Sequence, residues 1–249
     1  ILNNLDINIL QRNISSKIVK ITTFDEIDST NEQCKRDILD NRININIANK
    51  QTQGRGRRGK SWSSPDSGNI YMSLSKVNLT KQDFPLSLSV GLICQSAIQS
   101  FLTEEKIKLK WPNDILINNK KIGGILVEQE FFGSNVLSII GVGINLNIAK
   151  KEDWWGDLSE FSSLIKREEL INKIILKVLD FFENGIDNSV SQWEDICMHM
   201  NKEINIIQAN KVIDKGIFKG INEDGSMNIS NKNGKKTYLF GEVSIKGIY

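Results

Sequence analysis

The stretch of this sequence with the clearest chemical potential runs from Gln51 to Trp62 and reads Gln-Thr-Gln-Gly-Arg-Gly-Arg-Arg-Gly-Lys-Ser-Trp. Its glycines alternate with arginines. Glycine adopts positive φ at little steric cost, so the main chain can wrap closely around a ligand. Arginine carries a planar fork of N–H donors that matches carboxylate and phosphate groups. We therefore expect a loop that closes over an anion. A solvated basic loop or a nucleic-acid contact is the alternative for any such tract.

The same stretch matches the phosphate-binding pattern G-x-x-x-x-G-K-[ST] from Gly54 to Ser61. A P-loop needs a strand before the pattern and a helix that begins at the lysine. The strand is plausible over 43–50. Pro65 and Gly68, however, predict a turn where the helix would begin, and the alternation over 69–75 is typical of a strand. The context therefore argues against a P-loop.

Composition limits the remaining classes of function. The chain has 249 residues, is 39% hydrophobic and carries a net charge of +2, which suits one large domain plus a small one without a strong field for nucleic acid or membranes. No apolar run approaches a membrane span, and no signal peptide is recognisable. Three cysteines without a CxxC pair suit a reducing cytoplasm. The single histidine, His199, excludes a multi-histidine metal site, makes a Ser-His-Asp triad improbable and is expected at the surface or between domains.

Hydrophobic periodicity predicts the elements that must position these groups. In the first 200 residues we expect strands over 17–27, 43–51, 69–75, 120–128 and 136–140, a strand, turn and second strand over 108–117 with the turn at Trp-Pro-Asn-Asp, and helices over 29–39, 86–102, 164–184 and 190–200. After residue 200 the period changes to two, which predicts short strands over 203–208, 211–219, 226–230 and 235–240. The fold class is therefore α/β (α+β), with a domain over 1–200 and a small β-barrel domain over 201–249.

Three further motifs have functional alternatives. Ser29 and Glu32 have the spacing of a capping box, which is usually structural, although a helix N-terminus also favours anions. The paired glycines Gly123 and Gly124 indicate a bulge or the close approach of a ligand, which Lys121 would reach. On pattern alone, a surface lysine on an edge strand is the favoured reading of Lys121. The Gly-x-Gly at 141–143 again leaves room against the backbone.

Five motifs then occur in a fixed order: Asp-Ser-Thr-Asn, Gln-Thr-x-Gly-Arg-Gly-Arg-Arg-Gly-x-x-Trp, Lys-Trp-Pro-Asn-Asp, Lys-Ile-Gly-Gly-Ile-Leu-Val-Glu and Gly-Val-Gly-Ile-Asn-Leu-Asn. In this the chain resembles the biotin protein ligase family (biotin–[acetyl-CoA-carboxylase] ligase). The resemblance covers nearly the whole chain and implies a mixed-sheet catalytic domain with an SH3-like C-terminal barrel.

The resemblance also implies the reaction and its participants. Biotin and ATP, with Mg²⁺, would give biotinyl-5′-AMP, and the biotinyl group would pass to a lysine of biotin carboxyl carrier protein. A cytoplasmic enzyme is implied, and a homodimer is compatible with the resemblance. Members that also repress transcription carry an N-terminal DNA-binding domain. Only 28 residues precede Ser29 here, so we expect either a ligase without DNA binding or a trimmed start.

The resemblance implies a biotin site formed by Ser29, Thr30, Asn31, Gln51, Gly54, Arg55, Gly56, Arg57, Lys121 and Gly124. It implies an ATP site formed by Arg55, Arg57, Arg58, Trp62, Asn113, Lys121 and Asn145. Catalytic roles go to Lys121, Arg57, Lys110 and Asp114, and no residue is assigned as a metal ligand. Asp114 would orient lysines or magnesium; a structural turn carboxylate is the alternative.

Two other classes of function stay open at this point. A lipoate ligase or octanoyl transferase would share the acyl chemistry, but the Gly/Arg loop and the C-terminal strands argue against it. A DNA-binding regulator is disfavoured by the near-neutral charge and by the short segment before Ser29.

Overall fold

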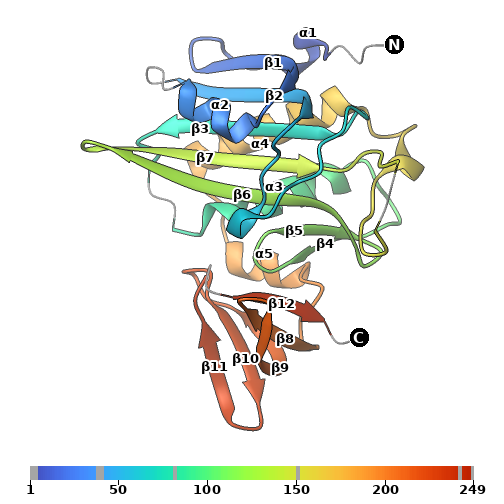
Figure 1. Ribbon diagram of the computed structural model, residues 1–249, viewed down its shortest axis with the longest axis vertical. Helices are drawn as coiled ribbons and strands as arrows, with labels where there is room; N and C mark the ends of the chain where they lie inside the picture. The colour runs from blue at the N-terminus through green and yellow to red at the C-terminus, as the bar shows by residue number, and fades with distance from the viewer. Residues whose placement is uncertain (1–4, 38–41, 81–82, 150–151, 241–242, 248–249) are drawn as a thin grey trace.

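The computed structural model describes residues 5–37, 42–80, 83–149, 152–240 and 243–247, and Figure 1 shows their arrangement. Seven strands form one sheet in the order β1-β2-β3-β7-β6-β5-β4. Only β1 and β2 pair in parallel; all other neighbours are antiparallel, which confirms the expected mixed sheet. The strands are β1 Val19–Ile27, β2 Ile43–Gln51, β3 Ile70–Val77, β4 Ile107–Lys110, β5 Asp114–Ile117, β6 Lys120–Phe132 and β7 Asn135–Ile144.

Helices cover both faces of this sheet. α2 (Thr30–Arg36) packs on β2, β3 and β7, whereas α3 (Leu86–Gln99) packs on β4, β5 and β6 and against α4 (Arg167–Asn184). Figure 1 shows α2 in front of the sheet and α3 and α4 behind it. The apolar stripe of α4 is buried as predicted, because leucine, isoleucine and valine recur at helical spacing. Gly185 ends the helix with φ 74°. The short helices α1 (Ile7–Leu10) and α5 (Ser189–Asp195) complete the set.

The predicted capping box at the start of α2 does not form. Ser29 is the N-cap residue, but its side chain makes no capping hydrogen bond, and Glu32 instead pairs with Lys35 and Arg55. Asp28 fastens the helix entry: it accepts from the Ser29 amide at 2.7 Å and from Arg36 at 2.6 and 2.8 Å. These contacts, the Arg36 guanidinium foremost, lower the pKa of Asp28 to about 2. The predicted end of this helix, at residue 39, lies outside the described residues.

Several predicted bounds need correction. β4 and β5 lie on either side of a turn at 111–113, as predicted, but β6 and β7 are longer than predicted because their hairpin pairs out to Phe132 and Asn135. α4 begins at Arg167, three residues late, and α5 ends at Asp195. β6 lies between β5 and β7, so Lys121 does not lie on an edge strand.

A second sheet follows α5, with strands in the order β11-β10-β9-β8-β12. They are β8 Glu203–Gln208, β9 Lys211–Ile221, β10 Met227–Asn231, β11 Gly234–Tyr238 and β12 Ser244–Gly247; the last was not predicted. The antiparallel arrangement fits the SH3-like type. Figure 1 shows this sheet below the first.

Trp111, in the turn between β4 and β5, joins the two sheets. Its side chain is 0% exposed, and its indole N–H donates to the carbonyl of Gly225 at 2.9 Å. Its ring meets Phe240 edge-on at 6.0 Å. A second contact comes from Glu194 of α5, whose Oε1 accepts a hydrogen bond from the Ile221 amide at 2.9 Å. Among the described residues, no helix combines the length and apolar character needed to cross a membrane.

Candidate active site

A cavity of about 930 Å³ opens on the α2 face of the large sheet. This is the size of a pocket for one or two small ligands. The loop that follows β2 forms one wall, and residues of the second sheet form another. All but one of the residues predicted for the site line the cavity: Ser29, Thr30, Asn31, Gln51, Arg55, Gly56, Arg57, Arg58, Trp62, Lys110, Asn113, Asp114, Lys121, Gly124 and Asn145.

The exception is Gly54, which does not line the cavity. A Cβ at this position would lie 2.4 Å from the carbonyl oxygen of Trp62 and 2.5 Å from Oγ of Ser64. The Trp62 amide also donates to the Gly54 carbonyl at 2.8 Å. Gly54 is therefore needed because the two ends of the loop approach closely, and not because a ligand does.

The loop itself is not a P-loop, as predicted. A single 3-10 turn covers Arg57–Gly59, and the next regular element is β3. Arg58 and Gly59 have φ values of 56° and 71°, which turn the chain back on itself. The bulge predicted near the paired glycines is present, since the pairing of β5 with β6 shifts by one residue between Ile115 and Leu116.

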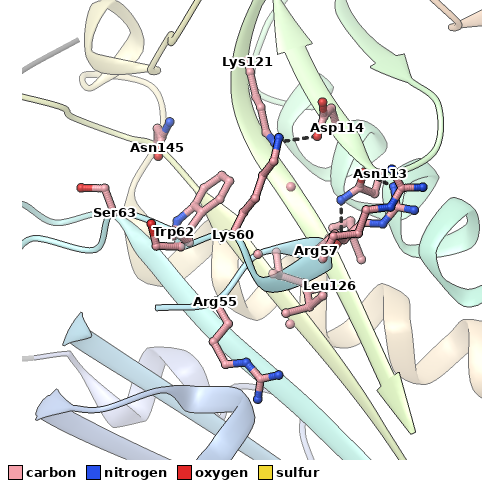
Figure 2. Close-up of a pocket in the computed structure, with 18 of the residues that line it drawn as sticks. Arg55, Arg57, Lys60, Trp62, Ser63, Asn113, Asp114, Lys121, Leu126 and Asn145 are labelled. Atoms are coloured by element: carbon pink, nitrogen blue, oxygen red, sulfur yellow. Dashed lines mark hydrogen bonds and ion pairs between the residues drawn. The ribbon is translucent and has the colours of Figure 1, made fainter. Parts of the chain in front are cut away.

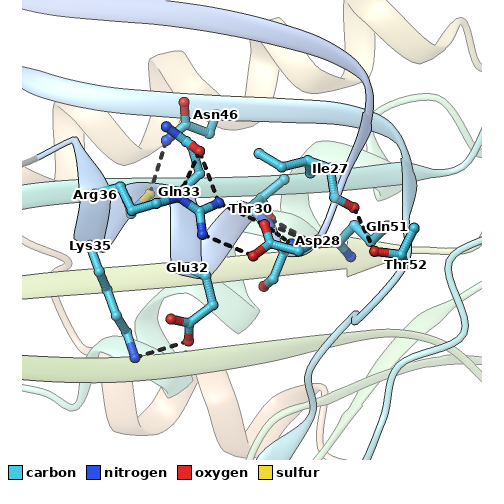
Figure 3. Close-up of polar contacts among 12 residues, drawn as sticks. Ile27, Asp28, Thr30, Glu32, Gln33, Lys35, Arg36, Asn46, Gln51 and Thr52 are labelled. Atoms are coloured by element: carbon cyan, nitrogen blue, oxygen red, sulfur yellow. Dashed lines mark hydrogen bonds and ion pairs between the residues drawn. The ribbon is translucent and has the colours of Figure 1, made fainter.

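One end of the cavity is a wall of neutral polar groups. Oε1 of Gln51 accepts from the Thr30 amide at 2.8 Å, and Nε2 of Gln51 donates to Ser64 at 2.9 Å; Figure 3 shows the contact with Thr30. The Thr30 hydroxyl lies 2.6 Å from that of Ser73, which donates to Oδ1 of Asn31 at 2.5 Å. Thr30, Asn31 and Ser73 are all at most 4% exposed. Hydroxyls and amides held this firmly suit a ligand that has both donors and acceptors.

The other end of the cavity carries positive charge. Nζ of Lys121 lies 2.6 Å from Oδ1 of Asp114, and Nζ of Lys110 lies 3.6 Å from Oδ2 of the same carboxylate. Arg57 donates to Oδ1 of Asn113 at 3.2 Å. Figure 2 shows Lys121 between Trp62 and Asp114, with Asn113 and Arg57 on the Asp114 side. Burial, together with the adjacent charge of Arg58, lowers the pKa of the Arg57 guanidinium. An anion bound here would offset the free-energy cost of burying the charged guanidinium.

Trp62 lies over the glycines of β6 and β7. A Cβ on Gly143 would lie 2.7 Å from its indole, and one on Gly124 would lie 3.3 Å away. The ammonium of Lys121 lies 5.2 Å from the ring centroid, a cation–π contact. These glycines therefore make room for an aromatic side chain of the protein itself, which a ligand against this strand has to share or displace. Gly141 similarly makes room for Asn31.

The guanidinium of Arg55 is not brought to the cationic end. It pairs with Glu32 and with Oε1 of Glu128, the latter at 2.8 Å. Figure 2 shows its side chain directed away from Lys121 and Arg57. Asn145 lines the cavity, is buried and donates to the Gly156 carbonyl at 3.1 Å.

Sequence patterns missed the contribution of the second sheet. Residues from the β8–β9 hairpin and from β12 line the same cavity: Ile207, Ala209, Asn210, Ser244, Ile245 and Lys246. Nothing in their spacing signals a site, because their position depends on how the two sheets pack. Lys246 brings a further positive charge to the cavity.

Comparisons with known proteins agree with this arrangement. The Biotin/lipoate A/B protein ligase family matches residues 23–145, and the Biotin protein ligase C terminal domain matches residues 199–246. The Bifunctional ligase/repressor BirA of Salmonella typhimurium is 30% identical over 233 residues, which are 88% of this chain and 72% of that protein. A Biotin–[acetyl-CoA-carboxylase] ligase of Paracoccus denitrificans is 33% identical over 111 residues, 40% of this chain and 43% of that protein.

Among solved structures, the biotin protein ligase from Aquifex aeolicus in complex with biotin and ATP superposes with a TM-score of 0.74 and 26% identity, over 92% of this chain and 99% of that one. The chain spans between 65% and 72% of the length of the curated ligase/repressors that it matches. The two matched domains, the relatives and the shared fold lead to one conclusion: the chain belongs to the biotin protein ligase family.

Proposed function

We propose that this protein activates biotin with ATP to give biotinyl-5′-AMP and pyrophosphate, and then transfers the biotinyl group to a lysine of biotin carboxyl carrier protein. The observation that carries the proposal is the polarity of the cavity. A neutral polar wall lies at one end, and a cluster of cations held by one carboxylate lies at the other.

The neutral wall suits the ureido ring of biotin. That ring presents two N–H donors and a carbonyl acceptor. The wall offers the hydroxyl of Ser29 and the side-chain groups of Thr30, Asn31 and Gln51. Thr30 and Gln51 are hydrogen-bonded to each other, and Asn31 is held by Ser73 and Glu128, so these three residues keep fixed positions before the ligand arrives.

The cationic end suits the reacting anions. A carboxylate oxygen of biotin attacks the α-phosphorus of ATP, and the bond from that phosphorus to the pyrophosphate oxygen breaks. Both reactants are negatively charged, so fixed positive charge stabilises the transition state. We assign that charge to Lys121, Arg57 and Lys110, with Asp114 as the group that positions both lysines. In the second step the carrier amine attacks the acyl carbon, and AMP leaves.

The residues around the cavity favour magnesium that arrives with the nucleotide. The described residues contain no group of three acidic, histidine or cysteine side chains arranged around a metal position, and Asp114 already contacts two ammonium groups. We therefore propose that Mg²⁺ enters as MgATP, held by phosphate oxygens and water.

The remaining assignments complete the proposal. The name of the Paracoccus relative supports a carboxyl carrier of acetyl-CoA carboxylase as the acceptor. A cytoplasmic location is supported by the free, buried thiols of Cys34, Cys94 and Cys197. A division into domains at residues 200 and 201 is supported by the start of β8 at Glu203. We propose a form that does not bind DNA, and a homodimer is left to sedimentation measurements.

The decisive experiment is isotope exchange between pyrophosphate and ATP. Exchange should require both biotin and Mg²⁺, and lipoate should neither replace biotin nor compete with it. Transfer should then be seen with an apo carrier domain and not with a carrier whose target lysine is replaced by arginine. Exchange that depends on lipoate instead of biotin would overturn the proposal.

A further inference from the structure

A continuous path of hydrogen bonds connects the two ends of the glycine-arginine loop through the polar wall. It starts at Arg55, which donates to Oε1 of Glu128 at 2.8 Å, while Oε2 of Glu128 accepts from Nδ2 of Asn31 at 2.8 Å. From Asn31 the path runs through Ser73 and Thr30 to Gln51.

The path returns to the loop at its other end. Gln51 donates to Oγ of Ser64 at 2.9 Å, and the Ser64 hydroxyl donates to the main-chain carbonyl of Trp62 at 3.0 Å. The proton directions are mutually consistent. The Ser73 hydroxyl donates to Asn31, so it accepts from the Thr30 hydroxyl. Oγ1 of Thr30 also lies 3.1 Å from Oε1 of Gln51, but its one proton goes to Ser73, so the Thr30 amide is the donor that holds Gln51. The part of the loop between Arg55 and Trp62 is therefore fastened at both ends to the wall that we assign to biotin.

Glu128 has a distinct place on this path. Its Oε1 accepts from the Arg55 guanidinium of the loop and also lies 3.6 Å from Nζ of Lys35, whereas its Oε2 accepts from the Asn31 amide of α2. Its side chain is 17% exposed, so these bonds are partly shielded from water. The two neighbouring carboxylates, Glu32 and Glu130, pair with cationic side chains. Glu32 contacts Arg55 and Lys35, and Glu130 contacts Lys35.

We propose that Glu128 is a positioning residue that couples occupation of the biotin wall to closure of residues 55–62. This inference rests on the proposed function. A ligand on Asn31 and Thr30 fixes the Asn31 amide, which fixes Glu128, which in turn holds Arg55 as one anchor of the moving loop. Arg57, between the anchors, is left to meet the anion. Without the carboxylate, the Asn31 amide and Arg55 compete for one acceptor, and the loop loses an anchor.

The test uses Glu128→Gln, which keeps the shape of the side chain but leaves a single acceptor oxygen. We expect the dissociation constant for biotin, measured without ATP, to rise about tenfold, and preformed biotinyl-AMP to dissociate about tenfold faster. The rate of exchange at saturating substrates should change less than threefold, because Lys121, Arg57 and Lys110 remain.

Two matched controls separate this role from loss of surface charge. Glu32→Gln removes the other carboxylate on Arg55, and Glu130→Gln removes a partner of Lys35. Both should keep the biotin dissociation constant within twofold. A double-mutant cycle combines Glu128→Gln with Arg55→Met. The two substitutions should be non-additive in the off-rate of the adenylate, because both remove the same loop anchor. They should be additive in the affinity for biotin, which Glu128 affects through Asn31.

The outcomes are distinct from those for the proposed function. If the unsubstituted protein shows no biotin-dependent exchange, the proposed function fails. If it does show exchange, then the coupling is overturned by parental values for both constants in a folded Glu128→Gln variant. It is also overturned if Glu128→Gln and Arg55→Met have additive effects on the off-rate of biotinyl-AMP. Should Glu128→Gln not fold, Arg55→Met alone must still accelerate the release of biotinyl-AMP, and an unchanged off-rate overturns the proposal.

Discussion

At the scale of single residues, Asp114 determines where the positive charge of the cavity lies. One carboxylate contacts both Lys121 and Lys110, so each lysine is held toward the cavity and is not free to extend into solvent. The contact gives a physical reason for the role that the resemblance implied for Asp114. Lys121 is the closer of the two lysines and also contacts Trp62.

Replacing Lys121 by alanine should therefore slow adenylate formation far more than it affects folding. The loss of one charge-assisted contact in the transition state should cost about 2–4 kcal/mol, or on the order of a hundredfold in exchange rate. Pyrophosphate exchange and thermal unfolding measure the two effects. Lys120→Ala, at the exposed neighbouring position, is the control. Parental exchange in a folded Lys121→Ala protein would remove Lys121 from the chemistry.

His199 is a buried titratable residue, not a surface one. It is 1% exposed and lies between α5 and β8, and burial, with help from Lys110 and Lys202, lowers its pKa to about 3. The unfolded chain binds this proton near the ordinary value of 6.5, and the folded chain does not. The free energy of unfolding is therefore highest above pH 6.5 and falls on acidification toward pH 3.

The expected contribution of His199 is a fall of about 1.4 kcal/mol in the free energy of unfolding for each pH unit below the unfolded value. Urea titrations between pH 7 and pH 5 measure it. His199→Gln places a neutral side chain at the same position, so its difference from the parent should shrink as pH falls. A pH-independent difference would contradict the assignment.

At the scale of elements, the loop after β2 depends on its two ends. Gly54 and Trp62 are bonded across its base, whereas Arg57 and Arg58 are adjacent like charges near its tip. An anion between them favours the closed arrangement.

Limited proteolysis should detect closure of this loop. Trypsin should cut after Arg57 or Arg58 in the unliganded protein, and biotin with MgATP should slow this cleavage at least fivefold. Cleavage at sites outside the loop gives the internal control. Equal cutting with and without substrates would show that the loop does not close over them.

Arg57→Gly tests the same loop as a lid. The substitution removes a guanidinium and adds backbone freedom that must be lost on closure. Adenylate should still form, because Lys110 and Lys121 remain. It should dissociate faster and label lysines of an unrelated protein such as albumin. Gln53→Gly adds a glycine to the loop without removing a charge, so it shows how much of the effect is flexibility. Retention of the adenylate without bystander labelling would exclude Arg57 from the lid.

Elements with a strong local pattern were predictable. The bounds of β2 and β8 follow from sequence, because runs of isoleucine leave no other compatible structure. β12 was missed since its four residues contain one buried apolar side chain.

The capping box failed because Glu32 has charged partners in Lys35 and Arg55, and the second of these comes from a distant loop that no local pattern includes. The motifs identified the residues that line the cavity. They could not predict which residues these contact, because those contacts depend on tertiary packing.

At the scale of the whole molecule, the cavity is shared between the two sheets. Lys110, Asn113 and Asp114 line it together with Trp111, whose ring is also buried against the second sheet. The short motif at 110–114 therefore contributes both to the cavity and to the packing of the two sheets against each other. This explains why the contribution of β12 was invisible in sequence: it exists only after the sheets pack.

Trp111→Phe should weaken both stability and nucleotide binding. It removes the bond to Gly225 and part of a fully buried ring, at a cost of about 2–4 kcal/mol in the free energy of unfolding. Because the second sheet walls the cavity, the KM for ATP should rise severalfold. Urea unfolding and exchange kinetics measure the two effects. Trp154→Phe, at a side chain that is 58% exposed, should change stability by less than 0.5 kcal/mol, roughly. Equal costs for the two variants would contradict the anchoring role.

The shared cavity also has a consequence for biosynthesis. Ser244, Ile245 and Lys246 are translated after every other residue that lines it. While a ribosome is still adding the second sheet, the first sheet can already fold as a unit. The nascent chain then carries Lys121 and the loop before Trp111 has the carbonyl of Gly225 to bind. The enclosed cavity, and with it retention of a reactive acyl adenylate, therefore arises only in chains whose residue 246 has left the exit tunnel.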